Sequence, residues 1–268
     1  MERKGARKKN LIPKSILIQL NKGEIESANL VEWLSVDQEI LLKNVLNELD
    51  LEHYYSAILQ NRNYLKTQST VKKTKLIAEG IAALMNEIKN EDMLSYLKTH
   101  SSDTVRSWAC YIMANKEYSN LEERLNNIKD FATDSHYRLK EISWIATRPY
   151  IAKDIVLSIK ILKNWAKSKD PNIRRFASES TRPRGVWCSH ITKLKEDPAI
   201  ALPILDPLKS DPSRYVQNSV GNWLNDASKS QESFVIACTN DWLEKSPSSE
   251  TLYIVNRALR TIRKKQKK

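Results

Sequence analysis

Glycine is scarce in this chain, with five residues among 268. Hairpin-rich folds use glycine in tight turns and nucleotide-binding α/β folds use it in phosphate loops, so its scarcity favours an all-helical protein. The chain also contains no P-loop, no dinucleotide-binding fingerprint and no metalloprotease helix motif. These absences argue against the nucleotide-dependent and metalloprotease classes that carry such motifs.

Cysteine is scarce as well, and Cys110, Cys188 and Cys238 lie far apart. Three isolated cysteines argue against a disulfide framework and fit a reducing compartment, so we expect a cytoplasmic protein. Cys188 lies close to His190, but no second pair stands at metal-ligand spacing. We therefore expect no metal site.

Long apolar runs are absent too. The basic first residues are followed by "LIPKSILIQL", which Pro13 and Lys14 interrupt too strongly for a signal peptide. No apolar run approaches the length that spans a membrane, so we expect no membrane partner.

The charge is strongly positive, at +12, with a pI of about 9.5. Such a balance suggests a polyanionic partner, although a lysine-rich solvated surface is the alternative. The ends "MERKGARKK" and "RTIRKKQKK" hold five and six basic residues against one acidic residue. They supply ten of the twelve charges, so the positions of the arginines in the middle of the chain must decide the question.

A helical repeat runs through the middle of the chain. Four segments share one plan, in which an Asp able to cap a helix is followed by an Arg three or four residues later and then by an apolar stripe. The four aspartates stand 31, 36 and 41 residues apart, and they are Asp103, Asp134, Asp170 and Asp211. An amphipathic helix precedes each segment, which is the spacing of HEAT-type helix pairs.

We therefore predict an all-α fold, an α-α superhelix (solenoid) of HEAT-like repeats. Residues 1–65 lack the repeat and are predicted to form an N-terminal helical cap with a disordered basic start. Residues 66–262 are predicted to form the repeat array, and residues 263–268 a basic tail. Both charged ends are expected to fray.

Helical numbering assigns faces within each repeat, because each residue turns by about 100°. Leu139, Ile142 and Ala146 lie on one side of their helix, and the opposite side carries Tyr137, Glu141, Trp144 and Arg148. Trp144 taken alone is better explained by packing into a neighbouring repeat. Trp108 and Trp223 fall on apolar stripes and are predicted to be core residues.

The repeats place a series of polar residues on faces opposite the apolar stripes. Arginine and asparagine are side chains that position a phosphate backbone, so the sequence favours double-stranded DNA as the partner. The predicted DNA-binding residues are Arg106, Arg138, Arg148, Arg174, Arg175, Arg182, Arg184, Arg214 and Asn218.

Two blocks carry a more specific signal. The segments "DPNIRRFASESTRPRGVW" and "DPSRYVQNSVGNWLNDASK" resemble the DNA alkylation repair family, the HEAT-like-repeat alkylpurine DNA glycosylases of the AlkC/AlkD superfamily. The resemblance implies an α-α superhelix that binds DNA on its concave face. It also implies hydrolysis of the N-glycosidic bond of cationic N3- or N7-alkylated bases, without a metal or cofactor.

The resemblance also suggests roles for individual residues. Tyr137 and Glu141 have the four-residue spacing of the Trp and catalytic Asp of AlkD-type members, which makes Glu141 the candidate catalytic carboxylate. Trp187 and Asn222 match aromatic positions of the family, and Arg174 or Arg175 matches its phosphate-binding arginine. The predicted lesion-lining residues are Tyr137, Trp144, Trp187 and Asn222.

The match departs from the family pattern at several of these positions. Tyr137 replaces a tryptophan, Glu141 replaces an aspartate, and Trp144 stands where AlkC-type members carry a glutamate. Two alternatives therefore remain beside the glycosylase: a non-catalytic binder of damaged or branched DNA, and a HEAT-repeat scaffold for a protein partner. We expect a monomer without an obligate protein partner. Glu179, next to Arg175 and Arg182 in helical numbering, is predicted to be structural.

Overall fold

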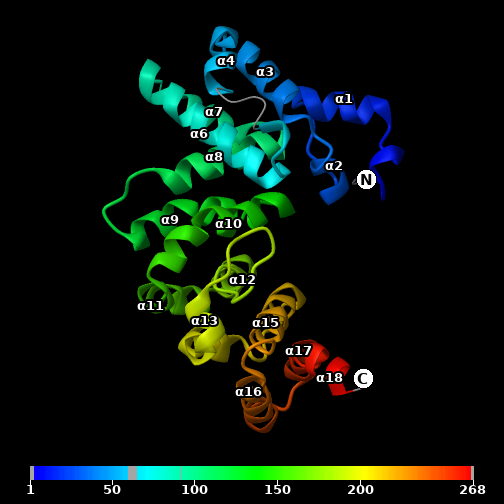
Figure 1. Ribbon diagram of the computed structural model, residues 1–268, viewed down its shortest axis with the longest axis vertical. Helices are drawn as coiled ribbons and strands as arrows, with labels where there is room; N and C mark the ends of the chain where they lie inside the picture. The colour runs from blue at the N-terminus through cyan, green and yellow to red at the C-terminus, as the bar shows by residue number, and fades with distance from the viewer. Residues whose placement is uncertain (1–2, 60–64, 91, 267–268) are drawn as a thin grey trace. The chain divides into compact units, whose positions relative to one another are not determined.

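The computed structural model describes residues 3–59, 65–90 and 92–266, and every regular element in these ranges is a helix (Figure 1). The chain divides into two compact units. Unit 1 comprises residues 1–116 and 136–142, and unit 2 comprises residues 117–135 and 143–268. The helix α10 (Tyr137–Lys153) begins in unit 1 and continues into unit 2.

Unit 1 is built around the helices α3, α6 and α8. Its core side chains include Leu41, Leu42, Ile81 and Trp108, each fully buried. Helix α8 packs against α6 and α7, and α3 packs against α1. The elements of this unit before α10 are η1 (Lys9–Leu11), α1 (Lys14–Lys22), α2 (Leu30–Trp33), α3 (Gln38–Glu48), η2 (Glu52–Tyr54), α4 (Tyr55–Ile58), α6 (Thr70–Ile88), α7 (Asp92–Thr99) and α8 (Asp103–Asn115).

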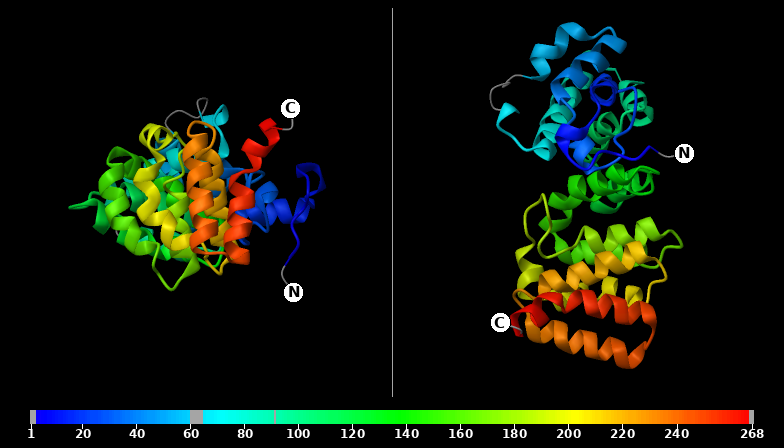
Figure 2. Two further views of the ribbon diagram at one scale, coloured as in Figure 1. Left: turned by 90° about the horizontal axis from the view of Figure 1, so that it is seen from below. Right: turned by 90° about the vertical axis from the view of Figure 1, so that its right-hand side faces the viewer.

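Unit 2 continues as helix pairs. Helix α15 lies between α12 and α17, while α11 packs against α12 and α16 packs beside α17 (Figure 2). The helix that precedes α10 is α9 (Leu121–Ala132). The elements that follow α10 are α11 (Ile155–Trp165), α12 (Pro171–Glu179), α13 (Thr192–Glu196), η3 (Pro198–Ala201), α14 (Leu202–Leu205), η4 (Asp206–Leu208), α15 (Arg214–Ala227), α16 (Glu232–Lys245), α17 (Ser249–Ala258) and α18 (Arg260–Gln266).

The predicted apolar stripes are confirmed as core. Leu139 and Ile142 on α10 are fully buried, as is Trp223 on α15, whose indole Nε1 donates a 3.0 Å hydrogen bond to the carbonyl of Thr181. Trp108 on α8 is fully buried too. Burying a large aromatic side chain contributes on the order of 2 kcal/mol, and the bond from Trp223 joins α15 to the residues that follow α12.

The repeated aspartates have more varied roles than simple capping. Asp170 caps α12 as predicted, because its carboxylate accepts from the amide of Asn172 at 2.7 Å. Asp103 instead lies inside α8 and accepts from the amide and hydroxyl of Ser27 at 2.9 and 2.7 Å. Asp211 precedes the N-cap of α15 rather than forming it.

Contacts or helical structure occur near both charged ends within the described residues. Arg3 donates to both carboxylate oxygens of Glu32, at 2.6 and 2.8 Å, and to the carbonyl of Glu26. Helix α18 continues to Gln266. The disordered start and the fraying of both ends stay predictions, and residues 1–2 and 267–268, on which they also fall, lie outside the described residues. The predicted boundary near residue 65 stays a prediction.

Candidate nucleic-acid interface

A loop after α12 exposes the tryptophan of the "TRPRGVW" motif. Trp187 is 51% exposed and its neighbour Val186 is 55% exposed. The backbone of Trp187 is left-handed, with φ at 68°, which is rare for a side chain of this size. A Cβ on Gly185 would lie 2.3 Å from the sulfur of Cys188, so only glycine fits there. The loop therefore presents an aromatic ring at the cost of backbone strain.

Arg148 holds this loop in place from α10. Its guanidinium donates to the carbonyls of Ser180 at 2.7 Å, Arg182 at 2.6 Å and Ser189 at 3.1 Å. The side chain is almost completely buried, and burial lowers its pKa. The prediction that Arg148 lies on an exposed DNA-binding face is wrong, because the stacked loop covers that face and uses its donors.

A buried ionic network lies beneath the same loop. Glu179 accepts from Arg182 at 2.6 Å and from the hydroxyl of Ser219 at 2.6 Å, and it lies 3.8 Å from Arg175. Burial raises the pKa of Glu179, but the two arginines and Ser219 outweigh this and hold it below its usual range. The structural pairing predicted for Glu179 is confirmed.

The same network accounts for three predicted DNA-binding arginines. Arg182 also donates to Asp226 at 2.6 and 2.9 Å, and Arg175 lies over the ring of Tyr215 at 4.2 Å and is mostly buried. Arg184, which is half-buried, donates to the carbonyl of Asp226 at 3.3 Å. The exposed face predicted for Arg175 is therefore wrong, whereas Arg184 stays close to the surface beside the loop.

Arg106 and Arg174 share another internal role. Arg174 donates to the carbonyls of Ser168 and Lys169, both at 2.9 Å, and to the two carboxylate oxygens of Asp211 at 2.6 and 2.9 Å. Arg106, two repeats earlier, makes the same kind of contacts, because it donates to the carbonyls of His100 at 2.8 Å and Ser101 at 3.2 Å and to Glu26. Both arginines close the turn within a helix pair, so their predicted exposure is wrong.

The face formed by α15 and α17 keeps its predicted polar row. The guanidinium of Arg214 lies 3.6 Å from the centre of the Tyr253 ring, and the Tyr253 hydroxyl donates to Asn218 at 2.8 Å. Asn222 accepts from Arg257 at 3.0 Å and from Arg260 at 2.9 Å. Sequence reasoning missed these last two arginines, which lie on the separate helices α17 and α18.

Unit 1 holds the predicted carboxylate. Glu141 is half-buried on α10, one turn after Tyr137. Burial raises the pKa of Tyr137 to about 12, so its phenol is neutral near pH 7. Arg138 is buried, with its guanidinium 3.5 Å from the centre of the Trp33 ring, and burial lowers its pKa while Glu141 opposes this. Its predicted position on an exposed face is wrong.

Trp144 is also a core residue. Its side chain is 2% exposed, so it packs into the protein, as expected for Trp144 taken alone. It does not line an open site. The predicted lesion-lining residues are thus divided between the two units. Tyr137 belongs to unit 1, and Trp187 and Asn222 belong to unit 2.

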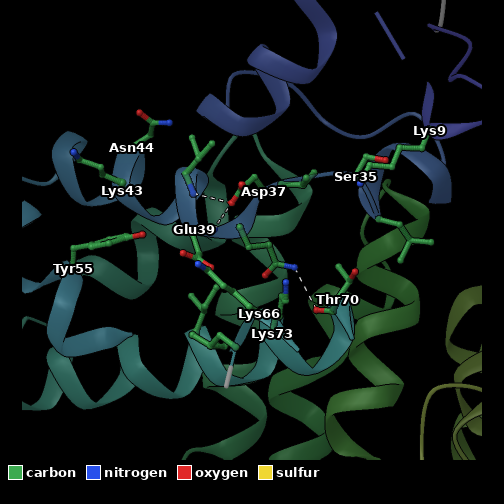
Figure 3. A pocket seen from close by; sticks show the side chains of 16 residues that line it. Lys9, Ser35, Asp37, Glu39, Lys43, Asn44, Tyr55, Lys66, Thr70 and Lys73 are labelled. Carbon is green, nitrogen blue, oxygen red and sulfur yellow. Dashed lines mark hydrogen bonds between the residues drawn. The ribbon is translucent and has the colours of Figure 1, made fainter. Parts of the chain in front are cut away.

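A pocket lies elsewhere, in unit 1. It has a volume of about 680 Å³ between α3, α4 and α6, and Lys43, Tyr55, Lys66 and Lys73 contribute to its wall (Figure 3). None of the predicted site residues lines it. Among the described residues, no cluster of His, Cys, Asp and Glu could hold a metal ion, and no helix is long and apolar enough to cross a membrane.

Comparison with known structures identifies the fold. The chain resembles the Pseudomonas fluorescens alkylpurine DNA glycosylase AlkC bound to DNA containing an abasic site analog, with a TM-score of 0.66 and 20% identity over 95% of this chain and 64% of AlkC. It also resembles AlkD2 from Streptococcus mutans, with a TM-score of 0.58 and 24% identity over 77% of this chain and 97% of AlkD2. The fold is therefore an all-α array of HEAT-like repeats.

The sequence comparisons add a family match over part of the chain. Residues 148–262 match the family model described as DNA alkylation repair enzyme, which confirms the resemblance carried by the two sequence blocks. The uncharacterized protein YhaZ of Bacillus subtilis (strain 168) is 37% identical over 139 residues, which cover 52% of this chain. The matched region spans 38% of the length of YhaZ.

Proposed function

We propose that this protein is a DNA repair glycosylase that hydrolyses the N-glycosidic bond of cationic N3- or N7-methylated bases in duplex DNA. The observation that carries the proposal is the match of residues 148–262 to the DNA alkylation repair enzyme family, because this segment contains the Trp187 loop and the polar row of α15. AlkC, whose fold is similar, is bound to DNA containing an abasic site analog, which resembles the product of base removal.

The chemistry needs few groups. A methylated purine already carries positive charge and leaves without a strong acid, so the remaining task is to stabilise an oxocarbenium-like sugar. In this proposal, the half-buried carboxylate of Glu141 supplies the negative charge, and the neutral phenol of Tyr137 lies one turn away.

Binding relies on the surface of unit 2. The exposed ring of Trp187 offers an apolar face on which a base can stack, and Arg184 beside it offers a cation for the backbone. Arg214 and Asn218 extend the polar surface along α15. The buried arginines of the network serve to hold these groups in place.

The proposal is tested by incubating the purified protein with methylated DNA and measuring released bases by chromatography. We expect release by the native protein and a loss of at least about 100-fold in the Glu141→Gln variant, because the stabilising charge is removed without a change of shape. The matched control is Glu122→Gln, which neutralises an exposed carboxylate on α9 and should retain full activity. Full activity of Glu141→Gln would exclude this carboxylate, and no release by the native protein would exclude the enzyme.

One observation favours a second candidate, a non-catalytic binder of damaged or branched DNA. Trp144 occupies the position of a glutamate in AlkC-type members, so this position carries no carboxylate, and the indole is buried. This candidate predicts binding of DNA without release of bases. A HEAT-repeat scaffold for a protein partner predicts neither release nor salt-sensitive binding of DNA.

A further inference from the structure

Two arginines in α17 and α18 have no acidic partner among the described residues. Arg257 lies on α17 and Arg260 begins α18, and both donate to the side-chain oxygen of Asn222, at 3.0 and 2.9 Å. Arg260 also donates to the carbonyl of Arg257 at 3.3 Å. In the described part of the chain, neither guanidinium forms an ion pair, and the two terminal nitrogens of Arg257 make no hydrogen bond. This contrasts with Arg174 and Arg182, whose guanidinium groups are paired with carboxylates.

The pair is held in a fixed position by the helices beneath it. Gly221 on α15 allows a close approach, because a Cβ there would lie 2.8 Å from the Cβ of Arg257. Asn225, which is 2% exposed, donates to the carbonyl of Ala258 at 3.1 Å and to the hydroxyl of Thr261 at 2.8 Å. These bonds fix the corner between α17 and α18, so a ligand that binds there causes little loss of side-chain or backbone entropy.

The electrostatics of the corner favour an anion. Partial burial and the charge of Arg257 lower the pKa of Arg260, and Asp226 only partly opposes this. Asp226 is itself engaged with Arg182 and Lys229. Two close guanidinium groups without their own counter-ion repel each other, and an anion that both can reach removes that repulsion.

We infer that Arg257, Arg260 and Asn222 form a binding site for a backbone phosphodiester of nucleic acid at the corner of α15, α17 and α18. The ligand carries two anionic oxygens that the free nitrogens of the two arginines can reach, while Asn222 holds both guanidinium groups in register. Arginine suits this role because its planar group binds a phosphate through two parallel hydrogen bonds. This inference rests on the proposed function, in which DNA is the ligand, and it extends the interface to residues that sequence reasoning missed.

The inference is tested by the salt dependence of binding to an undamaged duplex. The variant carries Arg257→Gln and Arg260→Gln, and the matched control carries Lys160→Gln and Lys163→Gln, which remove two exposed cations from α11 in the same unit. Each lost phosphate contact lowers the slope of log affinity against log salt by about 0.9, so the arginine variant, which removes the one phosphate shared by both arginines, should lose about 0.9 and the control much less. Equal slopes in the two variants would overturn the inference while leaving DNA binding intact.

A second measurement separates this site from the proposed function and from misfolding. Titration of the native protein with inorganic phosphate should shift the NMR signals of the side-chain Nε–H groups of Arg257 and Arg260. The conservative variant Arg257→Lys with Arg260→Lys should restore the salt slope in part, since it keeps the charge and loses the planar geometry. If the protein binds no DNA but phosphate shifts these signals, the proposed function fails and the anion site stands. If neither DNA nor phosphate shifts them, the inference fails as well.

Discussion

Arg148 shows how much a single side chain can organise at a surface. Three backbone carbonyls around the Trp187 loop accept from one guanidinium, and the loop backbone is otherwise closed by the bond from the amide of Ile191 to the carbonyl of Pro183 at 3.1 Å. The exposure of Trp187 therefore depends on an arginine that itself never reaches solvent.

We predict that Arg148→Met destabilises the protein by about 3 kcal/mol and frees the loop. Methionine fills the space but leaves three carbonyls without a donor, and hydrogen bonds to charged groups contribute about 1.5–3 kcal/mol each before relaxation. Chemical denaturation measures the loss, and trypsin cleavage after Arg184 reports the local opening. Lys153→Met, at an exposed position of the same helix, serves as the control. Unchanged cleavage after Arg184 would show that the loop does not depend on Arg148.

Helical numbering explains which part of this was predictable. It gives the direction of each Cα–Cβ bond, and the stripes of Leu139, Ile142 and Trp223 were assigned correctly on that basis. It does not say what covers the opposite face. Arg138 and Arg148 extend from that face into neighbouring side chains and loops, so their heads are buried although their numbering placed them away from the stripe.

At the scale of the helix pair, the repeated Asp and Arg have a structural meaning. Arg106 and Arg174 each donate to carbonyls of the turn that precedes their own helix. Arg174 also donates to Asp211, the aspartate of the next repeat. The pattern was visible in the sequence, and it predicted the repeat correctly. The exposure that it predicted for these two arginines was wrong, because the same guanidinium that suits a phosphate also suits a carboxylate and carbonyls within a tight turn.

A histidine in one of these turns makes the stability of unit 1 sensitive to pH. The ring of His100 is buried, its Nδ1 accepts from the amide of Ser102 at 3.0 Å, and its Nε2 lies 3.3 Å from Glu48. Burial lowers its pKa from the ordinary value of 6.5, with Glu48 opposing and Arg106 assisting. The folded protein therefore favours the neutral ring, whose Nδ1 has a free lone pair for the amide.

We predict that unit 1 loses stability as the pH falls below about 6.5. The unfolded chain then binds a proton more readily than the folded chain does. The stabilising contribution of His100 is therefore present above this pH and disappears as the pH falls to the lower pKa of the folded state. Each unit of depression of the pKa corresponds to about 1.4 kcal/mol. Unfolding by denaturant at about pH 7.5 and about pH 5 measures the slope, which His100→Asn should flatten. His190→Asn, at an exposed position, should leave it unchanged.

Across the whole molecule, the middle of the sequence is nearly neutral and the two ends are strongly basic. Sequence reasoning established the all-α class, the helix pairs and the family resemblance, because these depend on periodicity and on two long blocks. It could not separate arginines that face solvent from those that serve the fold, because that depends on contacts between residues about 35–80 positions apart, such as Arg174 with Asp211 and Arg106 with Glu26. Only the structure singled out Arg257 and Arg260 as cations that have no acidic partner in the part of the chain that it describes.

The exposed cations that follow them in α18 should act at long range rather than as a binding site. Arg263, Lys264 and Lys265 are exposed, and Lys265 forms an exposed ion pair with Glu232 at 3.0 Å. We predict that replacing all three by glutamine changes the stability by less than about 0.5 kcal/mol and slows association with DNA several-fold at low salt. The effect should vanish at about 1 M salt, where the screening length falls to about 3 Å. Stopped-flow association rates across a salt series measure it. Because dissociation depends on contacts made in the complex, the dissociation rate of this variant should match that of the native protein, and a faster rate would place these residues in the interface itself.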